Sequence, residues 1–209
     1  MPLGGLIHTA PASRLGLLLY VCRAAVYHHP APDQPHNRLM TKEYKALPPA
    51  DRLWTLFDLN PLTGKLFWRV RVSARCSMDK PAGCKARNGY TVVRVDGVLY
   101  GVHRLIRAWV DGDTNIQAGI DHWDRNPQNN TPWNLRLCTQ SQNMANVPRK
   151  GWTKTAGGKY AAVIKFQGQN ISLGQFVTPL EASAAYITAK RLLFGGFACV
   201  DLTSYNKQY

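Results

Sequence analysis

The sequence has few acidic residues for its length. Only 12 of its 209 residues are Asp or Glu, against 26 Lys or Arg, and the formal net charge is +14. Such an excess favours a polyanionic partner and steers nucleic acid toward the protein from a distance. An acidic membrane surface is a weaker alternative, because no long basic amphipathic helix is evident. We therefore expect a nucleic-acid partner and no membrane association.

Cysteine is scarce, and its spacing is irregular. None of the five cysteines belongs to a Cys-x-x-Cys pair, so the usual ligand spacing of a tetrahedral structural zinc site is missing. The odd number argues against a disulfide framework, and we expect free thiols in a reducing compartment. The five are Cys22, Cys76, Cys84, Cys138 and Cys199.

Nucleotide-binding fingerprints are also missing. Gly157-Gly158-Lys159 lacks the upstream glycine and the following Ser or Thr of a P-loop, and no dinucleotide fingerprint occurs. The hydrophobic content of 45% is ordinary for a globular protein. The length suits one ordinary domain or two small ones.

Residues 1–39 differ from the rest of the chain. The first acidic residue is Asp33, and the apolar run at residues 15–22 is short and interrupted by Arg23. A secretory signal would need a longer apolar core and a small-residue cleavage site. The segment faintly resembles an organelle transit peptide, but we favour a disordered or mis-assigned leader, with translation starting at Met40.

Residues 120–143 carry strand, loop and helix signals in succession. Period-two alternation predicts strands at residues 120–123 and 135–138, and the Asn-, Pro- and Asp-rich run between them predicts a loop. Thr139-x-x-Gln142 is a capping-box signature that starts a helix. The predicted unit is strand, loop, strand, helix.

This unit can bring Asn143, early in the helix, against the strand that carries Asp121 and His122. Carboxylate and carboxamide oxygens are hard ligands that suit Mg²⁺, which keeps waters and takes further ligands from substrate phosphate. A neutral imidazole can remove a proton from water, and a metal can stabilise the charge on the phosphate and leaving oxygen. The pattern predicts metal-assisted phosphodiester hydrolysis. For Asp-His alone, a plain surface turn is the alternative.

The order Asp121-His122, Asn134 and Asn143, with an Asp-x-Asn-x-x-Asn-Asn loop between, resembles the zinc-free branch of the HNH nucleases. Many of these are phage-borne or intron-borne homing endonucleases. The resemblance implies His122 as general base and Asp121 and Asn143 as ligands of Mg²⁺ or Mn²⁺, with no zinc. It implies that Asn134 ties down the loop. Asn143 stands where many relatives have His, a variation that this branch permits.

The region before this unit is predicted to be rich in short strands and to contain one helix. Asp96-Gly97 is a strong hairpin signal, and apolar spacing predicts a helix at about residues 103–110. The order Tyr-x-x-His-Arg-Leu at residues 100–105 is usual in the same nuclease branch. It includes His103, for which a structural role is at least as good an interpretation as a catalytic one. The predicted strands are residues 53–57, 66–70, 89–95 and 98–100.

The basic junction at residues 147–150 suggests a domain boundary. Beyond it, strands are predicted at residues 151–154, 159–166 and 169–176. A helix should begin at the capping box Thr178-x-x-Glu181, with Pro at its first position, and end at Gly195-Gly196.

This C-terminal pattern resembles the Apetala-type (ethylene-response factor) DNA-binding domain over residues 146–200. The motifs that carry the resemblance are Gly-Lys-Tyr, Leu-Gly-x-Phe, Glu-Ala-x-x-Ala-Tyr and Phe-Gly-Gly-Phe-Ala. In that family the sheet lies in the major groove. Here the sheet has little Arg, the residue best suited to bidentate guanine readout. The implied DNA-binding candidates are Lys154, Lys159, Lys165 and Gln167, with Trp152 and Tyr160 as contributors and Arg149 and Lys150 in the junction.

The expected fold is α+β. A β-rich region leads into a ββα-metal HNH core in a domain at residues 40–146, and a three-stranded antiparallel sheet packed on one helix follows at residues 147–209. The expected function is a metal-dependent endonuclease that nicks or cuts double-stranded DNA, monomeric on DNA, in the cytoplasm of a bacterial host if phage-encoded. The alternatives are a non-catalytic DNA-binding transcriptional regulator and, more weakly, an RNA-binding protein with stacking aromatics.

Overall fold

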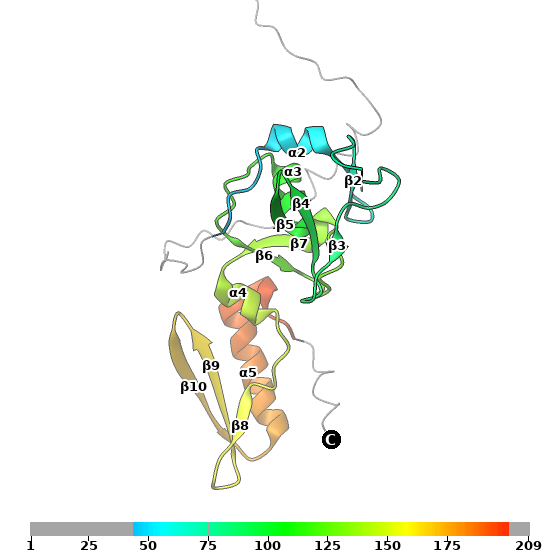
Figure 1. The fold of residues 1–209 in the computed structure, drawn as a ribbon. Helices are drawn as coiled ribbons and strands as arrows, with labels where there is room; N and C mark the ends of the chain where they lie inside the picture. Colours follow the sequence, from blue (N-terminus) through cyan, green and yellow to red (C-terminus); the bar gives the residue numbers. More distant parts are fainter. Residues whose placement is uncertain (1–43, 75, 201–209) are drawn as a thin grey trace, which may run out of the picture.

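The computed structural model describes residues 44–74 and 76–200. The leader, Met40 and Cys22 lie outside this part of the chain. The described residues form short helices and small antiparallel sheets, which confirms the predicted α+β class. Figure 1 shows β1 to β7 in one half of the molecule, β8 to β10 with α5 in the other, and α4 between them. None of the described helices is long and apolar enough to cross a membrane.

The first described helix replaces a predicted strand. Residues 53–57 were expected to be extended, but α2 (Ala50–Leu56) is helical, and the strand β1 (Phe57–Asn60) starts only afterwards. Leu53 and Leu56 lie three residues apart and are both buried, as on one face of a helix. A short apolar run does not distinguish a buried helix from a strand, so the prediction was wrong here.

The next elements build the core of the larger half. β1 pairs with β2 (Lys65–Trp68), and β4 (Thr91–Val95) pairs with β3 (Cys84–Lys85) and β5 (Val98–Gly101). The predicted hairpin turn is present, with positive φ at both Asp96 and Gly97. The helix α3 (Val102–Asp111) follows β5 directly, and its buried face includes Leu105 and Ile106. These side chains join those of α2, β1, β2 and β4 in one hydrophobic core.

The predicted strand, loop, strand, helix unit is confirmed. β6 (Gly119–His122) pairs antiparallel with β7 (Leu135–Cys138), which a short 3₁₀ turn, η1 (Pro132–Asn134), precedes. The helix α4 (Gln140–Ala145) begins at a complete capping box formed by Thr139 and Gln142. α4 packs on both β6 and β7.

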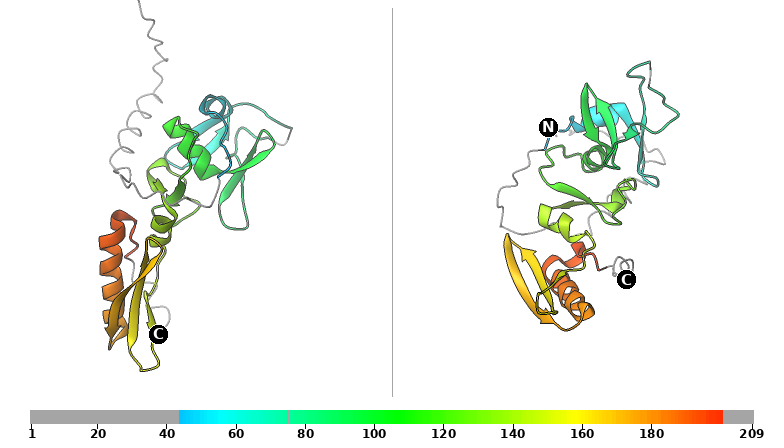
Figure 2. Two further views of the ribbon diagram at one scale, coloured as in Figure 1. Left: turned by 90° about the vertical axis from the view of Figure 1, so that its left-hand side faces the viewer. Right: turned by 60° about the horizontal axis from the view of Figure 1, so that its bottom comes forward.

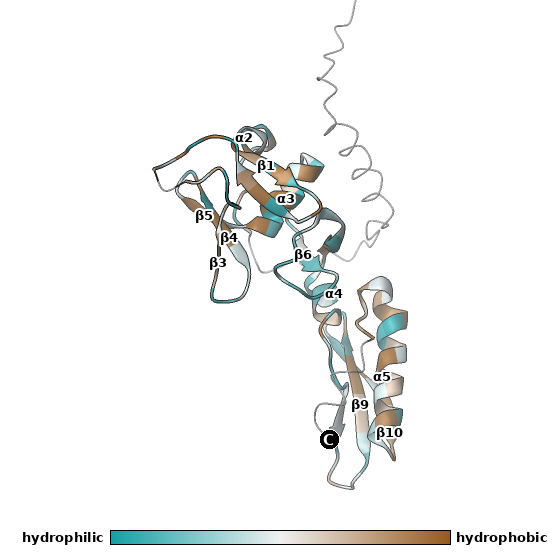
Figure 3. Ribbon diagram, turned by 90° about the vertical axis from the view of Figure 1, so that its right-hand side faces the viewer, coloured by the Kyte–Doolittle hydropathy of each residue, from teal (hydrophilic) through white to brown (hydrophobic). Residues whose placement is uncertain are grey.

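The C-terminal part has the predicted three strands and helix. β9 (Tyr160–Phe166) lies between β8 (Trp152–Lys154) and β10 (Gln169–Phe176). The helix α5 (Pro179–Phe194) covers one face of this sheet, and a short 3₁₀ turn, η2 (Gly195–Phe197), follows it (Figure 2). Figure 3 shows that α4 is largely hydrophilic whereas β9 is largely hydrophobic. The exact division of the chain near residue 147 stays a prediction.

Gly64, in the turn between β1 and β2, contacts the backbone of the loop that follows β6. Its φ is +61°, and a Cβ there would lie 2.2 Å from both the carbonyl carbon of Asn130 and the nitrogen of Thr131. Gly64→Ala should therefore reduce the free energy of unfolding by about 3 kcal/mol or more. Gly97→Ala is the matched control, because Gly97 has φ +81° and no atom within 4 Å of the added Cβ. It should cost only about 1 kcal/mol of conformational strain, and equal losses in urea unfolding would contradict the contact.

Candidate active site

His122 ends β6 and is oriented by the loop that follows. Its side chain is buried, and its Nε2 lies 2.9 Å from Oδ1 of Asn130, which is also buried. With the Asn130 oxygen as acceptor, Nε2 carries the proton, and Nδ1 is the basic nitrogen of the neutral ring. No hydrogen bond to Nδ1 is formed by the described residues. The sequence placed Asn130 in the loop but gave no sign of this contact.

Asp121 precedes His122 and is held by two residues that the sequence analysis did not select. Asn146 donates from Nδ2 to both carboxylate oxygens at 3.0 Å and to the backbone carbonyl of His122 at 2.8 Å. Nε of Arg136, the residue opposite Asp121 in β7, donates to Oδ2 at 2.8 Å. Its Nη2 also lies 2.7 Å from that oxygen. Because a carboxylate oxygen has about two acceptor positions, Oδ2 is fully used, whereas Oδ1 can take one more ligand.

Asn143 lies on the same face of α4 as Asn146. The two residues are three positions apart, and side chains at this spacing are neighbours on a helix. Because Asn146 reaches Asp121 and α4 packs on β6, this spacing leads us to expect Asn143 on the same side of the helix. Its side chain is half-buried and forms no hydrogen bond with the described residues. An open carboxamide beside a carboxylate with one open position fits a hard divalent cation that takes its other ligands from water and phosphate.

Asn134 braces the loop between β6 and β7. Its Nδ2 donates to Oδ1 of Asp124 at 2.8 Å and to the backbone carbonyl of Asn129 at 2.7 Å. Its Oδ1 accepts from the backbone nitrogen of Asp124 at 3.0 Å. Although partial burial acts to raise the pKa of Asp124, hydrogen bonds from the Asn126 backbone, Asn129 and Asn134 hold it below the ordinary value. The loop is therefore a network of polar contacts centred on an ionised carboxylate.

His103 lies beside the proposed base. Its ring centroid is 5.5 Å from that of His122 and 5.2 Å from that of Tyr90. Burial lowers the pKa of His103 to about 3, and the neighbouring His122 and Arg104 lower it as well. This imidazole therefore stays neutral near pH 7. The rings of His103 and Tyr90 both pack against the ring of His122.

Arg136 connects Asp121 to the end of the C-terminal part. Its Nη1 donates to the carbonyl of Gly196 at 2.8 Å, and its guanidinium carbon lies 4.0 Å above the ring of Phe197. The backbone nitrogen of Cys199 donates to the carbonyl of Ala145 at 2.9 Å. The segment after α5 therefore returns to the unit that carries the site.

The described part of the chain contains no cluster of metal-ligating side chains and no disulfide. No group of three or more His, Cys, Asp or Glu side chains that could hold a metal ion occurs there. The four cysteines within it are free. Burial raises the pKa of the Cys138 thiol to about 12, so this thiol stays protonated near pH 7.

The predicted DNA-binding side chains do not share one surface. Trp152 is 9% exposed and lies opposite Ala162, on the sheet face covered by α5. Tyr160 packs edge-on against Trp152, with ring centroids 4.9 Å apart. Strand alternation therefore turns both aromatics toward the helix, and their contribution to DNA binding stays a prediction.

The polar candidates are spread around the sheet. Lys165 is exposed on the outward face, where its neighbours include Val163 and Ala161. Lys154 is exposed at the end of β8, on the same face of the strand as Trp152. The remaining four are exposed in connecting segments and are Arg149, Lys150, Lys159 and Gln167.

Comparisons with known proteins agree with the geometry. Residues 100–145 match the family described as HNH endonuclease. An uncharacterized HNH endonuclease of Acanthamoeba polyphaga mimivirus is 32% identical over 117 residues. The match covers 54% of this chain and 62% of that protein. No solved structure matches the chain significantly. The stretch that is similar to this family runs from the end of β5 through α3 to α4.

Asn146 and Asn143 allow the same substitution to be compared one helical turn apart. Asn146→Ala removes the donor to a buried carboxylate and a backbone carbonyl. Because hydrogen bonds to charged groups contribute about 1.5–3 kcal/mol, the free energy of unfolding should fall by about 3 kcal/mol. Asn143→Ala breaks no hydrogen bond and should change it by less than about 0.5 kcal/mol. Urea unfolding of both variants measures this difference, and similar losses would show that Asn146 does not hold Asp121.

Proposed function

We propose that the chain is a metal-dependent DNA endonuclease that hydrolyses phosphodiester bonds. The observation that carries the proposal is the geometry at the end of β6. Asn130 orients the His122 ring, the adjacent residue Asp121 has a carboxylate with one open position, and Asn143 of the neighbouring helix α4 has a carboxamide that forms no hydrogen bond with the described residues. The match of residues 100–145 to the HNH endonucleases supports the same conclusion.

His122 acts as the general base in this proposal. Asn130 accepts from Nε2 and so leaves Nδ1 to take a proton from the attacking water. The hydrogen bond that Nε2 donates to Asn130 also favours the charged ring after proton transfer. His122 and Asp121 are adjacent in β6 and point to opposite faces. A phosphate that meets both groups therefore lies at the end of the strand, where His122 is the last residue.

Asp121 and Asn143 would hold one Mg²⁺ or Mn²⁺. When bound, such an ion stabilises negative charge on the transferring phosphate and on the leaving oxygen. Asn146 and Arg136 fix the direction of the Asp121 carboxylate and leave one acceptor position of Oδ1 for the ion. Asn134 keeps the loop in place, and with it the Asn130 contact to His122.

The net charge of +14 favours a polyanionic substrate, and the similarity to HNH endonucleases leads us to propose double-stranded DNA. The C-terminal sheet and helix would act as an Apetala-type DNA-binding domain that positions the nuclease region. With a single candidate site among residues 44–74 and 76–200, we propose a monomer that nicks one strand at a time. By resemblance, the protein would be a homing-type endonuclease carried by a phage and active in the cytoplasm of its host.

Cleavage of supercoiled DNA tests the proposal. The wild-type protein should produce nicked or linear DNA with Mg²⁺ or Mn²⁺, and EDTA should stop the reaction. His122→Ala should reduce the rate at least about a hundredfold, the lower range for a general base, while DNA affinity measured in EDTA stays unchanged. Because the substitution leaves a space in a buried position, added imidazole should restore part of the rate.

The control is thermal unfolding of both proteins, which shows whether His122→Ala keeps the fold. Full cleavage by folded His122→Ala would contradict the assignment of the base. If the wild-type protein binds several DNA targets but cuts none with either metal, the non-catalytic DNA-binding regulator becomes the better interpretation.

A further inference from the structure

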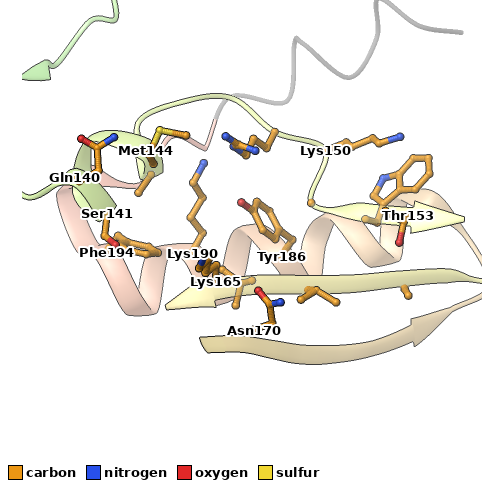
Figure 4. A pocket seen from close by; sticks show the side chains of 17 residues that line it. Gln140, Ser141, Met144, Lys150, Thr153, Lys165, Asn170, Tyr186, Lys190 and Phe194 are labelled. Carbon is orange, nitrogen blue, oxygen red and sulfur yellow. The ribbon is translucent and has the colours of Figure 1, made fainter. Parts of the chain in front are cut away.

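A cleft of about 680 Å³ lies between α4, the segment that connects α4 to β8, and the C-terminal sheet and helix. Figure 4 shows Gln140 and Met144 of α4 on one side, Thr153 of β8 on the other, and Tyr186 and Lys190 of α5 between them. β8 pairs with only the first part of β9, up to Ala162. The cleft occupies the space left beside the rest of β9.

The lining is strongly basic. Four of its side chains carry positive charge, and none of the lining residues is acidic. Lys165 is the one basic strand residue on the outward face of the sheet, and it also lines the cleft. The cleft therefore gathers four of the seven Lys and Arg residues between residues 147 and 200. The four residues are Arg149, Lys150, Lys165 and Lys190.

Lys190 is a buried cation without an acidic partner. It is 2% exposed, and its Nζ donates to the backbone carbonyl of Val147 at 2.9 Å. No carboxylate among the described residues pairs with it. Burial lowers the pKa of Lys190. The nearby Cys199 acts to raise this pKa, and the positive charges of Arg149 and Arg125 lower it further. A carbonyl does not neutralise this charge, and burying an ammonium without a counter-charge is costly.

The remaining walls suit the sugar and base portions of a nucleic acid. Much of the lining is apolar or aromatic, with Met144, Val163 and Phe194 among its members. Met144 and Val163 are exposed. Apolar and aromatic surface beside cations is the usual composition of a groove that follows a nucleic-acid strand. A peptide occupant is disfavoured, since a peptide would neutralise four cations only if it were acidic.

The geometry points to this cleft as a binding site for the DNA backbone, in which Lys190 contacts a phosphate. The site rests on the proposed endonuclease function and deepens it. α4 supplies both Met144 in the cleft and Asn143 at the candidate metal site, so one strand of DNA can pass along α4 from the cleft to the scissile phosphate. Lys190 was not among the DNA-binding residues expected from the sequence. Nothing in the sequence distinguishes it from an ordinary lysine on the face of a helix.

DNA binding as a function of salt tests the site. Fluorescence anisotropy of a labelled duplex in EDTA should show about tenfold weaker binding by Lys190→Met, the loss expected for one charge-assisted hydrogen bond. The slope of log affinity against log salt should become shallower by about one unit, because one phosphate contact is lost. Lys65→Met is the matched control. Lys65 is an exposed lysine of β2, outside the cleft, and its loss should leave affinity and slope nearly unchanged.

A second variant covers the case in which Lys190→Met fails to fold. Arg149 and Lys165 are exposed, so the double variant Arg149→Gln, Lys165→Gln should keep the fold and make the slope shallower by about two units. An unchanged slope in this variant, or in a folded Lys190→Met, would overturn the site. If the wild-type protein still cuts DNA in that case, the proposed function stands. A wild-type protein that neither binds nor cuts DNA would overturn both.

Inorganic phosphate provides the last arm of the test. A site for a small free anion would give a higher melting temperature with phosphate than with chloride at equal ionic strength. It would give this increase in the wild-type protein and not in Lys190→Met. That result together with an unchanged DNA salt slope would contradict a DNA-backbone site. A shallower slope in Lys190→Met with no phosphate effect would support it.

Discussion

The hydrogen bonds from Asn146 to Asp121 and to the backbone of His122 fix the arrangement on which the site depends. A buried carboxylate must be paired and hydrogen-bonded, because an isolated buried charge is costly. Asn146, at the C-terminal end of α4, and Arg136 of β7 donate the hydrogen bonds that this carboxylate requires. The three elements of the unit are therefore held together by the side chain that we propose as a metal ligand, and Arg136 extends the same network to Phe197 after α5.

Much of the fold followed from local signals in the sequence. The Thr139 and Gln142 side chains form the capping box at the start of α4, and Asp96-Gly97 forms the turn between β4 and β5. Alternation predicted the bounds of β7 without error. These signals act over a few residues and need no knowledge of distant partners. Where the apolar pattern was short and ambiguous, as at Leu53 to Leu56, tertiary packing decided in favour of a helix.

The contacts that organise the site could not be read from the sequence in the same way. Asn130 meets His122, and Arg136 meets Phe197, only because the chain folds back on itself. One signal was present for Asn146, since its spacing from Asn143 is that of neighbours on a helix face. For Trp152, the residue type did not indicate the face of the sheet on which the side chain lies. Its residue type suited a DNA-facing strand, but the pairing register with Ala162 turned it toward α5.

Cleavage of the protein chain by bound iron tests the central claim most directly. With hydrogen peroxide added, Fe²⁺ that replaces Mg²⁺ at a binding site reduces the peroxide to hydroxide and a hydroxyl radical and becomes Fe³⁺. The radical cuts the backbone nearby, and mass spectrometry locates the cuts. The account predicts cuts in β6 and α4, around Asp121 and Asn143, that excess Mg²⁺ suppresses and that Asp121→Asn loses. Asp121→Asn is chosen because it keeps the shape of the side chain beside Asn146 and Arg136. Cuts elsewhere, or the same cuts in folded Asp121→Asn, would contradict a metal site at Asp121.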